Sequence, residues 1–256
     1  MTECERMSER RPEDPPATDS DTSSVSIEDD GLLRWLLRSE EGTVVVVRDV
    51  ASTVAIVALI GLVLFAASGV WPPLVAVESG SMEPNMHTGD LVFVVDDDRF
   101  VGENAVDGTG VVTLEDGQNG GDKHFGRPGD VIVFAPDGDA SKTPVIHRAR
   151  FWVEEGENWV ETKADADALD GRTCADLSSC PAPHDGFVTK GDANDLYDQV
   201  DGRYAETTVV KPDWVSSKAG FRIPWLGRVR LAFDSLFAVV TPQPLSGPLS
   251  SPILWP

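Results

Sequence analysis

The sequence predicts a β-rich domain of the all-β class that follows a single membrane-spanning helix. Two observations predict this arrangement: one long uncharged apolar stretch, and a series of short β-branched runs after it that lack long helical periodicity. The 256 residues suffice for one large domain with accessory segments, and a hydrophobic content of 41% is enough for a core.

The apolar stretch runs from Ala51 to Val70 without a charged residue. A helix rises about 1.5 Å per residue, so these twenty positions reach about 30 Å, the thickness of a hydrocarbon core. A cleavable signal peptide would lie nearer the start and be shorter, and a buried helix of a soluble protein remains the other alternative. We predict a transmembrane helix at 48–71, with Trp71 at the level of the lipid headgroups.

The charges around this span predict its orientation. Arg34, Arg38 and Arg48 precede it closely, whereas the first cation beyond Trp71 is Arg99. Positive residues favour the cytoplasmic side of a membrane. We therefore expect a single-pass protein of the cell membrane with a cytoplasmic N-terminus and an extracytoplasmic domain.

Composition divides the remaining chain. Residues 1–47 are predicted to be an acidic, largely disordered cytoplasmic tail with a short amphipathic segment, "GLLRWLLRSEEG". Residues 72–235 form the predicted domain, with insertions near 102–129 and 154–186, and 236–256 form a Pro-rich tail. Five segments of the domain are expected to be strands: "LVFVV" at Leu91, "VIVF" at Val131, "VIHRARFWV" at Val145, "WVET" at Trp159 and "FVTKGD" at Phe187.

Charge and cysteine content restrict the possible partners. The formal net charge of −22 disfavours nucleic acid or anionic lipid as a partner of the soluble part. Such acidity is typical of halophilic proteins, although an acidic mesophilic surface explains it too. Cys174 and Cys180 are either a small-loop disulfide or two free thiols, while Cys4 lies on the predicted reducing side. With His184 as at most a third nearby ligand, the sequence predicts no metal site.

The stretch "ESGSMEPNMHTGDLVFV" raises the question of chemistry. It is rich in turn-forming residues and places Ser81 in a turn before a strand, where it is either a turn residue or a nucleophile. A serine nucleophile needs a base, and His147 is the histidine within a strand-like run. The acidic turn "KGDANDLYD" offers Asp192, Asp195 and Asp198 as candidate orienting carboxylates, but by itself also fits a calcium loop or a solvated bend.

These segments together resemble a known family. "SGSMEP" with "GDLVFV", then "GDVIVF", "VIHR", "TKGDANDLYD" and "GFRIPWLG" are similar, in order and character, to the boxes of type I signal peptidases of the archaeal and endoplasmic-reticulum branch. The resemblance implies a membrane-bound serine endopeptidase that removes signal peptides from exported preproteins after small residues. Its expected partners are preprotein signal peptides and the lipid membrane, with no cofactor. Whether accessory subunits take part stays open.

The resemblance also implies roles for individual residues. Ser81 matches the nucleophile, His147 the general base of the Ser-His branch, and Asp198 the carboxylate that this branch needs. Asp192 matches an aspartate that supports the site. Ser79 matches the position whose hydroxyl helps to bind the oxyanion in bacterial relatives.

Other interpretations remain at this stage. A membrane-anchored β domain without activity would bind partner proteins, and a self-cleaving repressor-type peptidase would use Ser and Lys. Lys142 and Lys190 are conceivable bases in place of His147, although a lysine base must be desolvated, and neither sequence context favours that.

Overall fold

The computed structural model describes residues 42–121, 123–201 and 206–229. The acidic tail before residue 42, with the amphipathic segment and Cys4, and the predicted Pro-rich tail at 236–256 lie outside these residues.

Helix α3 (Gly42–Ser68) is 27 residues long and contains the uncharged stretch. Among the described residues it is the helix with the length and composition to cross a membrane, and none of its most apolar window is buried in the protein. The core helix of a soluble protein would be mostly buried. The helix overlaps the predicted span of 48–71 but has different limits.

The C-terminal end of α3 is fixed by its neighbours. Gly69 adopts a positive φ of 84°, a common way to end a helix. The guanidinium of Arg99 donates to the carbonyl oxygens of Ala66 and Ala67 in the last turn, where a cation also favours the helix dipole. The Ser68 hydroxyl donates to the Val94 carbonyl at 2.7 Å. The helix therefore ends against the strand that follows the candidate nucleophile.

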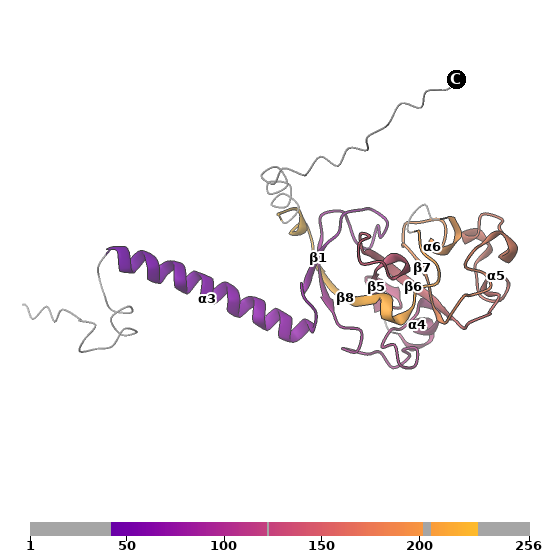
Figure 1. The fold of residues 1–256 in the computed structure, drawn as a ribbon, viewed down its shortest axis with the longest axis horizontal. Helices are drawn as coiled ribbons and strands as arrows, with labels where there is room; N and C mark the ends of the chain where they lie inside the picture. The colour runs from indigo at the N-terminus through magenta and orange to yellow at the C-terminus, as the bar shows by residue number, and fades with distance from the viewer. Residues whose placement is uncertain (1–41, 122, 202–205, 230–256) are drawn as a thin grey trace, which may run out of the picture. The chain divides into compact units, whose positions relative to one another are not determined.

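The domain is built on one six-stranded antiparallel sheet with the strand order β1-β2-β8-β5-β6-β7 (Figure 1). Its strands are β1 (Leu74–Ala76), β2 (Leu91–Val95), β8 (Val215–Ile223), β5 (Val131–Phe134), β6 (Val145–Val153) and β7 (Gly186–Lys190). Strands β3 (Lys123–His124) and β4 (Arg127–Pro128) form a separate small ladder. The β-rich fold class with one N-terminal apolar helix is confirmed.

Several short elements connect the strands. They are α4 (Leu114–Gly120), η1 (Pro136–Gly138), α5 (Trp159–Thr162), η2 (Ala166–Ala168), η3 (Cys174–Asp176), α6 (Asp198–Asp201) and η4 (Pro212–Trp214). The predicted insertion at 102–129 contains α4 with β3 and β4, and the one at 154–186 contains α5, η2 and η3.

Central strands β2 and β5 are buried at every position, which explains their uninterrupted apolar sequences. The predicted strands at Leu91, Val131, Val145 and Phe187 correspond to β2, β5, β6 and β7. The prediction of a strand for "WVET" was wrong, because these residues form α5. Asn158 caps that helix, since its side chain accepts from the Glu161 N–H, and the indole of Trp159 is buried and donates to the Ser179 carbonyl.

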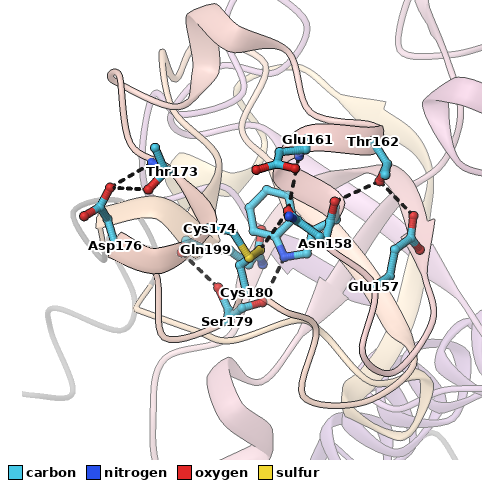
Figure 2. The surroundings of a disulfide bond; sticks show 11 residues. Glu157, Asn158, Glu161, Thr162, Thr173, Cys174, Asp176, Ser179, Cys180 and Gln199 are labelled. Atoms are coloured by element: carbon cyan, nitrogen blue, oxygen red, sulfur yellow. Dashed lines mark hydrogen bonds between the residues drawn. A yellow bond between two sulfur atoms is a disulfide. The ribbon is translucent and has the colours of Figure 1, made fainter.

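Cys174 and Cys180 form a disulfide (Figure 2), which decides between the two alternatives left by the sequence. Cys180 is buried in a core cluster that also contains Tyr197 and Val200. The Ser179 hydroxyl donates to the Gln199 carbonyl at 3.2 Å. The disulfide loop therefore supports the segment that carries Asp198.

Candidate active site

Ser81 lies in the loop between β1 and β2, and two methionines anchor this loop. Met82 and Met86 are fully buried in the cluster formed with β2 and β5. The Glu83 N–H donates to the Gly80 carbonyl and the Met86 N–H to the Met82 carbonyl, which makes a compact turn. Ser81 itself is half-buried and lines a pocket, while the turn around it holds its backbone.

Asp90 fixes the far end of this loop. Its buried carboxylate accepts from the His87 N–H at 3.0 Å, from Arg222 at 2.7 Å and from the Trp225 N–H at 3.2 Å. Burial alone would raise the pKa of Asp90, but these hydrogen bonds and the charge of Arg222 hold it below its ordinary value. Asp90 thereby joins the Ser81 loop to the end of β8.

His147 lies on β6 and is 2% exposed. Its Nε2 is 2.9 Å from Ser81 Oγ, and its Nδ1 is 2.7 Å from Asp198 Oδ2. An ionised carboxylate can only accept a hydrogen bond, so a neutral ring beside it carries its proton on Nδ1. Nε2 is then left with a lone pair directed at the Ser81 hydroxyl, the arrangement in which a histidine can remove the proton of a serine.

Ser79 is brought beside the candidate nucleophile, because the two hydroxyl oxygens are 3.2 Å apart. The backbone N–H of Ser81 donates none of the hydrogen bonds found between described residues. Within the described part of the chain, the Ser79 hydroxyl therefore has Ser81 Oγ as its hydrogen-bond partner, and the Ser81 N–H has none.

The Asp192 carboxylate makes no hydrogen bond to the side chains of Ser81, His147 or Asp198. Its buried carboxylate accepts two hydrogen bonds from Arg148, at 2.9 and 2.7 Å, and one from Asn85 at 2.8 Å. Burial alone would raise the pKa of Asp192, but the hydrogen bonds and charge of Arg148, with that of Asn85, hold it below its ordinary value. The carboxylate joins the Ser81 loop, through Asn85, to β6, through Arg148.

Arg148 is fully buried, and its third nitrogen donates to backbone carbonyls around the small β3–β4 ladder. The nearest is the Gly129 carbonyl at 2.6 Å, followed by those of His124 at 3.1 Å and Pro128 at 3.3 Å. All three nitrogen atoms of the guanidinium therefore donate hydrogen bonds. A buried arginine held in this way positions backbone and carries no solvent-exposed charge.

The two candidate lysines are directed elsewhere. Lys142 Nζ is 3.2 Å from the Asp137 carboxylate at the surface. Lys190 Nζ donates to the carbonyl oxygens of Asn194 and Asp195. Burial, and then the charge of Arg150, lowers the pKa of Lys190, but its amine has no hydrogen bond to Ser81 in the described part of the chain.

Ser81 and His147 line a pocket of about 710 Å³. Its walls are mainly apolar and come from β1, β2, β5, β8, the start of β6 and the segments that precede β1 and β6. They include Val75, Ala76, Val94, Val133, Pro144 and Ile146. β1 is the outermost strand at one end of the sheet, and it contributes directly to this wall. The nucleophile candidate therefore faces a cavity large enough for several side chains of an extended peptide.

Comparison with known proteins finds similarity to one kind of protein, a catalytic subunit of the signal peptidase complex. No protein-family model matches the chain. Over 171 residues it is 26% identical to the signal peptidase complex catalytic subunit SEC11C of Homo sapiens, Mus musculus and Canis lupus familiaris. The similarity supports the signal peptidase family. The aligned part covers 67% of this chain and 62% of the length of each relative.

Sequence reasoning missed three residues of the site. Asn85, Arg148 and Thr189 each lie within or beside a segment that it had singled out, and Thr189 Oγ1 donates to Asp198 Oδ2 at 2.7 Å. For Arg148 the sequence did contain a signal. Side chains alternate along a strand, so Arg148 lies on the face of β6 opposite His147, and an arginine buried there needs a carboxylate partner.

Proposed function

We propose that the protein is a membrane-bound serine endopeptidase that cleaves signal peptides from exported preproteins after small residues. The observation that carries this proposal is the hydrogen-bonded series from Ser81 through His147 to Asp198 at the wall of an apolar pocket. The similarity to catalytic subunits of a signal peptidase complex supports the substrate class. We assign the chain to the Ser-His branch on the same hydrogen bonds.

The proposed reaction uses each group in turn. His147 takes the proton of Ser81 as the oxygen attacks the scissile carbonyl, and Asp198 stabilises the resulting imidazolium. The Ser81 N–H and the Ser79 hydroxyl donate to the developing oxyanion, and oxyanion-hole donors of this kind are generally worth several kcal/mol. His147 then gives its proton to the leaving amine as the peptide bond breaks. Water next attacks the acyl carbon; His147 takes its proton and passes it to Ser81 Oγ as the ester bond breaks, which releases the acyl product as a carboxylate and restores the serine.

The membrane anchor fits this substrate. Ser81 follows Trp71 by ten residues, and an extended chain covers about 3.3 Å per residue, so Ser81 lies at most about 33 Å from Trp71. A signal peptide keeps its apolar segment in the bilayer and exposes its cleavage site just outside. We propose a cytoplasmic N-terminus and an extracytoplasmic domain, and a halophilic source for a chain with a net charge of −22.

The proposal is tested with detergent-solubilised protein and a preprotein in concentrated salt. Wild type should release the mature protein, and Ser81→Ala should be slower by about three orders of magnitude or more. Ser141→Ala removes a surface hydroxyl that is bonded to Asp139, and it should cleave at the wild-type rate. Equal cleavage by wild type and Ser81→Ala, or none by either, would favour the β domain that only binds partners.

A further inference from the structure

Thr189 makes the second side-chain contact of the carboxylate that orients the candidate base. It is fully buried on β7, opposite Ala149 of the neighbouring β6. Thr189 Oγ1 is 2.7 Å from Asp198 Oδ2, the same oxygen that lies 2.7 Å from His147 Nδ1. The other carboxylate oxygen, Oδ1, is buried and has no hydrogen-bond partner among the described residues. Within the described chain, the side-chain contacts of Asp198 therefore converge on one oxygen.

The direction of the Thr189 hydrogen bond follows from Gln199. The Thr189 backbone N–H can only donate, and it donates to Gln199 Oε1 at 3.1 Å. The amide nitrogen of Gln199 consequently faces Thr189 Oγ1 and the Thr208 carbonyl, both at 3.2 Å, and donates to them. Because Thr189 Oγ1 accepts from Gln199, its own proton is directed to Asp198.

The register of the sheet makes this contact possible. Residues that are two apart on a strand face the same side, so Ala149 shares a face with His147, and its partner Thr189 does as well. Ala149 is small and fully buried, which leaves room for Thr189 to reach the carboxylate beside the imidazole. A β-branched threonine also has few side-chain rotamers, so its hydroxyl is held with little loss of freedom.

We propose that Thr189 is a positioning residue for the reaction of Ser81, acting through Asp198. Its hydroxyl holds Asp198 Oδ2 in the position from which it accepts the hydrogen bond of His147 Nδ1. The side-chain amide of Gln199 holds the Thr189 hydroxyl in turn. This inference rests on the proposed peptidase function. It assigns to Thr189 an effect on the chemical step and none on substrate binding.

The test compares two Thr→Val variants. Thr189→Val keeps the shape of the side chain and removes the hydroxyl, and kcat for preprotein cleavage should fall about 10- to 100-fold with little change in KM, the expected loss for a hydrogen bond to a charged group. Thr113→Val is the matched control, because the buried Thr113 hydroxyl also donates to a carboxylate at 2.7 Å, that of Asp116, in a different part of the domain. Its kcat should equal that of wild type.

Two further variants separate the hydroxyl from packing. Thr189→Ser should keep most of the activity and Thr189→Ala should lose it, although both remove the methyl group. This comparison also serves if Thr189→Val does not fold. In an Asp198→Ala background, Thr189→Val should change kcat by less than about two-fold, because neighbouring groups that act as a unit are not additive.

The results that overturn the inference are specific. The positioning role is excluded if Thr189→Val leaves kcat unchanged or changes KM alone. It is also excluded if Thr189→Ser and Thr189→Ala lose equal activity, or if Thr189→Val causes its full loss of kcat in the Asp198→Ala background. Ser81→Ala is measured alongside. If it abolishes cleavage while Thr189→Val behaves like Thr113→Val, only the role of Thr189 fails; if Ser81→Ala cleaves normally, the proposed function fails instead.

Discussion

The proposal that His147 is the base rests on a single contact, that between His147 Nε2 and Ser81 Oγ. Lys142 and Lys190 are held by a surface carboxylate and by backbone carbonyls, respectively, so neither amine is directed at the serine. A base that cannot reach the hydroxyl proton cannot activate it, whatever its pKa.

We expect His147→Ala to lower kcat/KM for preprotein cleavage by about three orders of magnitude or more, because the serine then has no base. Lys142→Ala and Lys190→Ala, made separately, should retain most of the activity. The measurement is initial cleavage rate at several substrate concentrations. Near-normal turnover by His147→Ala, with inactivation by either lysine variant, would replace the Ser-His assignment with Ser-Lys.

At the scale of elements, one buried ion pair joins pieces that are far apart in the chain. Asp192, in the turn after β7, holds Arg148 on β6 and Asn85 in the Ser81 loop, and Arg148 in turn holds the backbone around β3 and β4. Removing one partner of a buried pair leaves the other charge unpaired, which typically costs about 3 to 5 kcal/mol.

We predict that Asp192→Asn lowers the melting temperature at pH 7 and that its deficit depends on pH. The pKa of Asp192 is lowered in the folded protein, so its carboxylate stabilises the fold above the unfolded pKa, and this contribution is lost as pH falls through the folded pKa. The gap between wild type and Asp192→Asn should therefore narrow below about pH 4. Asp195→Asn, at an exposed position of the same turn, is the control; a gap that stays constant with pH would contradict the assignment.

The elements differ in how well sequence alone predicts them. Strands β2 and β5 are short runs of apolar, mostly β-branched residues, and this composition favours a buried strand, as the structure has it. The segment of α5 has the same aromatic and β-branched composition, but Asn158 caps it and the buried Trp159 finds an acceptor at Ser179, so tertiary contacts override its strand propensity. Strand β8 was not predicted, because its sequence "VSSKAGFRI" mixes small, polar and charged residues and only its pairing with β2 and β5 makes it a strand.

Some residues of the candidate site could also be predicted from the sequence, and others could not. Ser81, His147 and Asp198 are chemically distinctive residues in recognisable segments, and the structure brings all three together. The supporting contacts of Asn85 and Thr189 could not be predicted, because they depend on which residues face each other across the loop and across strands.

At the scale of the whole molecule, the placement of charges predicts which segments a protease reaches. We expect a protease added to intact cells to cleave the exposed loops around Gly120 and Asp170 and to spare the tail before Gly31. Antibodies against each segment would follow the fragments, and detergent-permeabilised cells provide the control in which the tail is cleaved as well. Digestion of the tail alone in intact cells would reverse the proposed orientation.

The distribution of the three reactive groups along the chain affects when activity can arise. Ser81 and His147 are 66 residues apart, and His147 and Asp198 are a further 51 apart. Synthesis proceeds from the N-terminus, so Ser81 is made before His147, the proposed base, and His147 before Asp198, the proposed orienting group. Under the proposed function, a nascent chain therefore cannot cleave substrate before Asp198, and the later strand β8 that pairs with β2 and β5, have been synthesised.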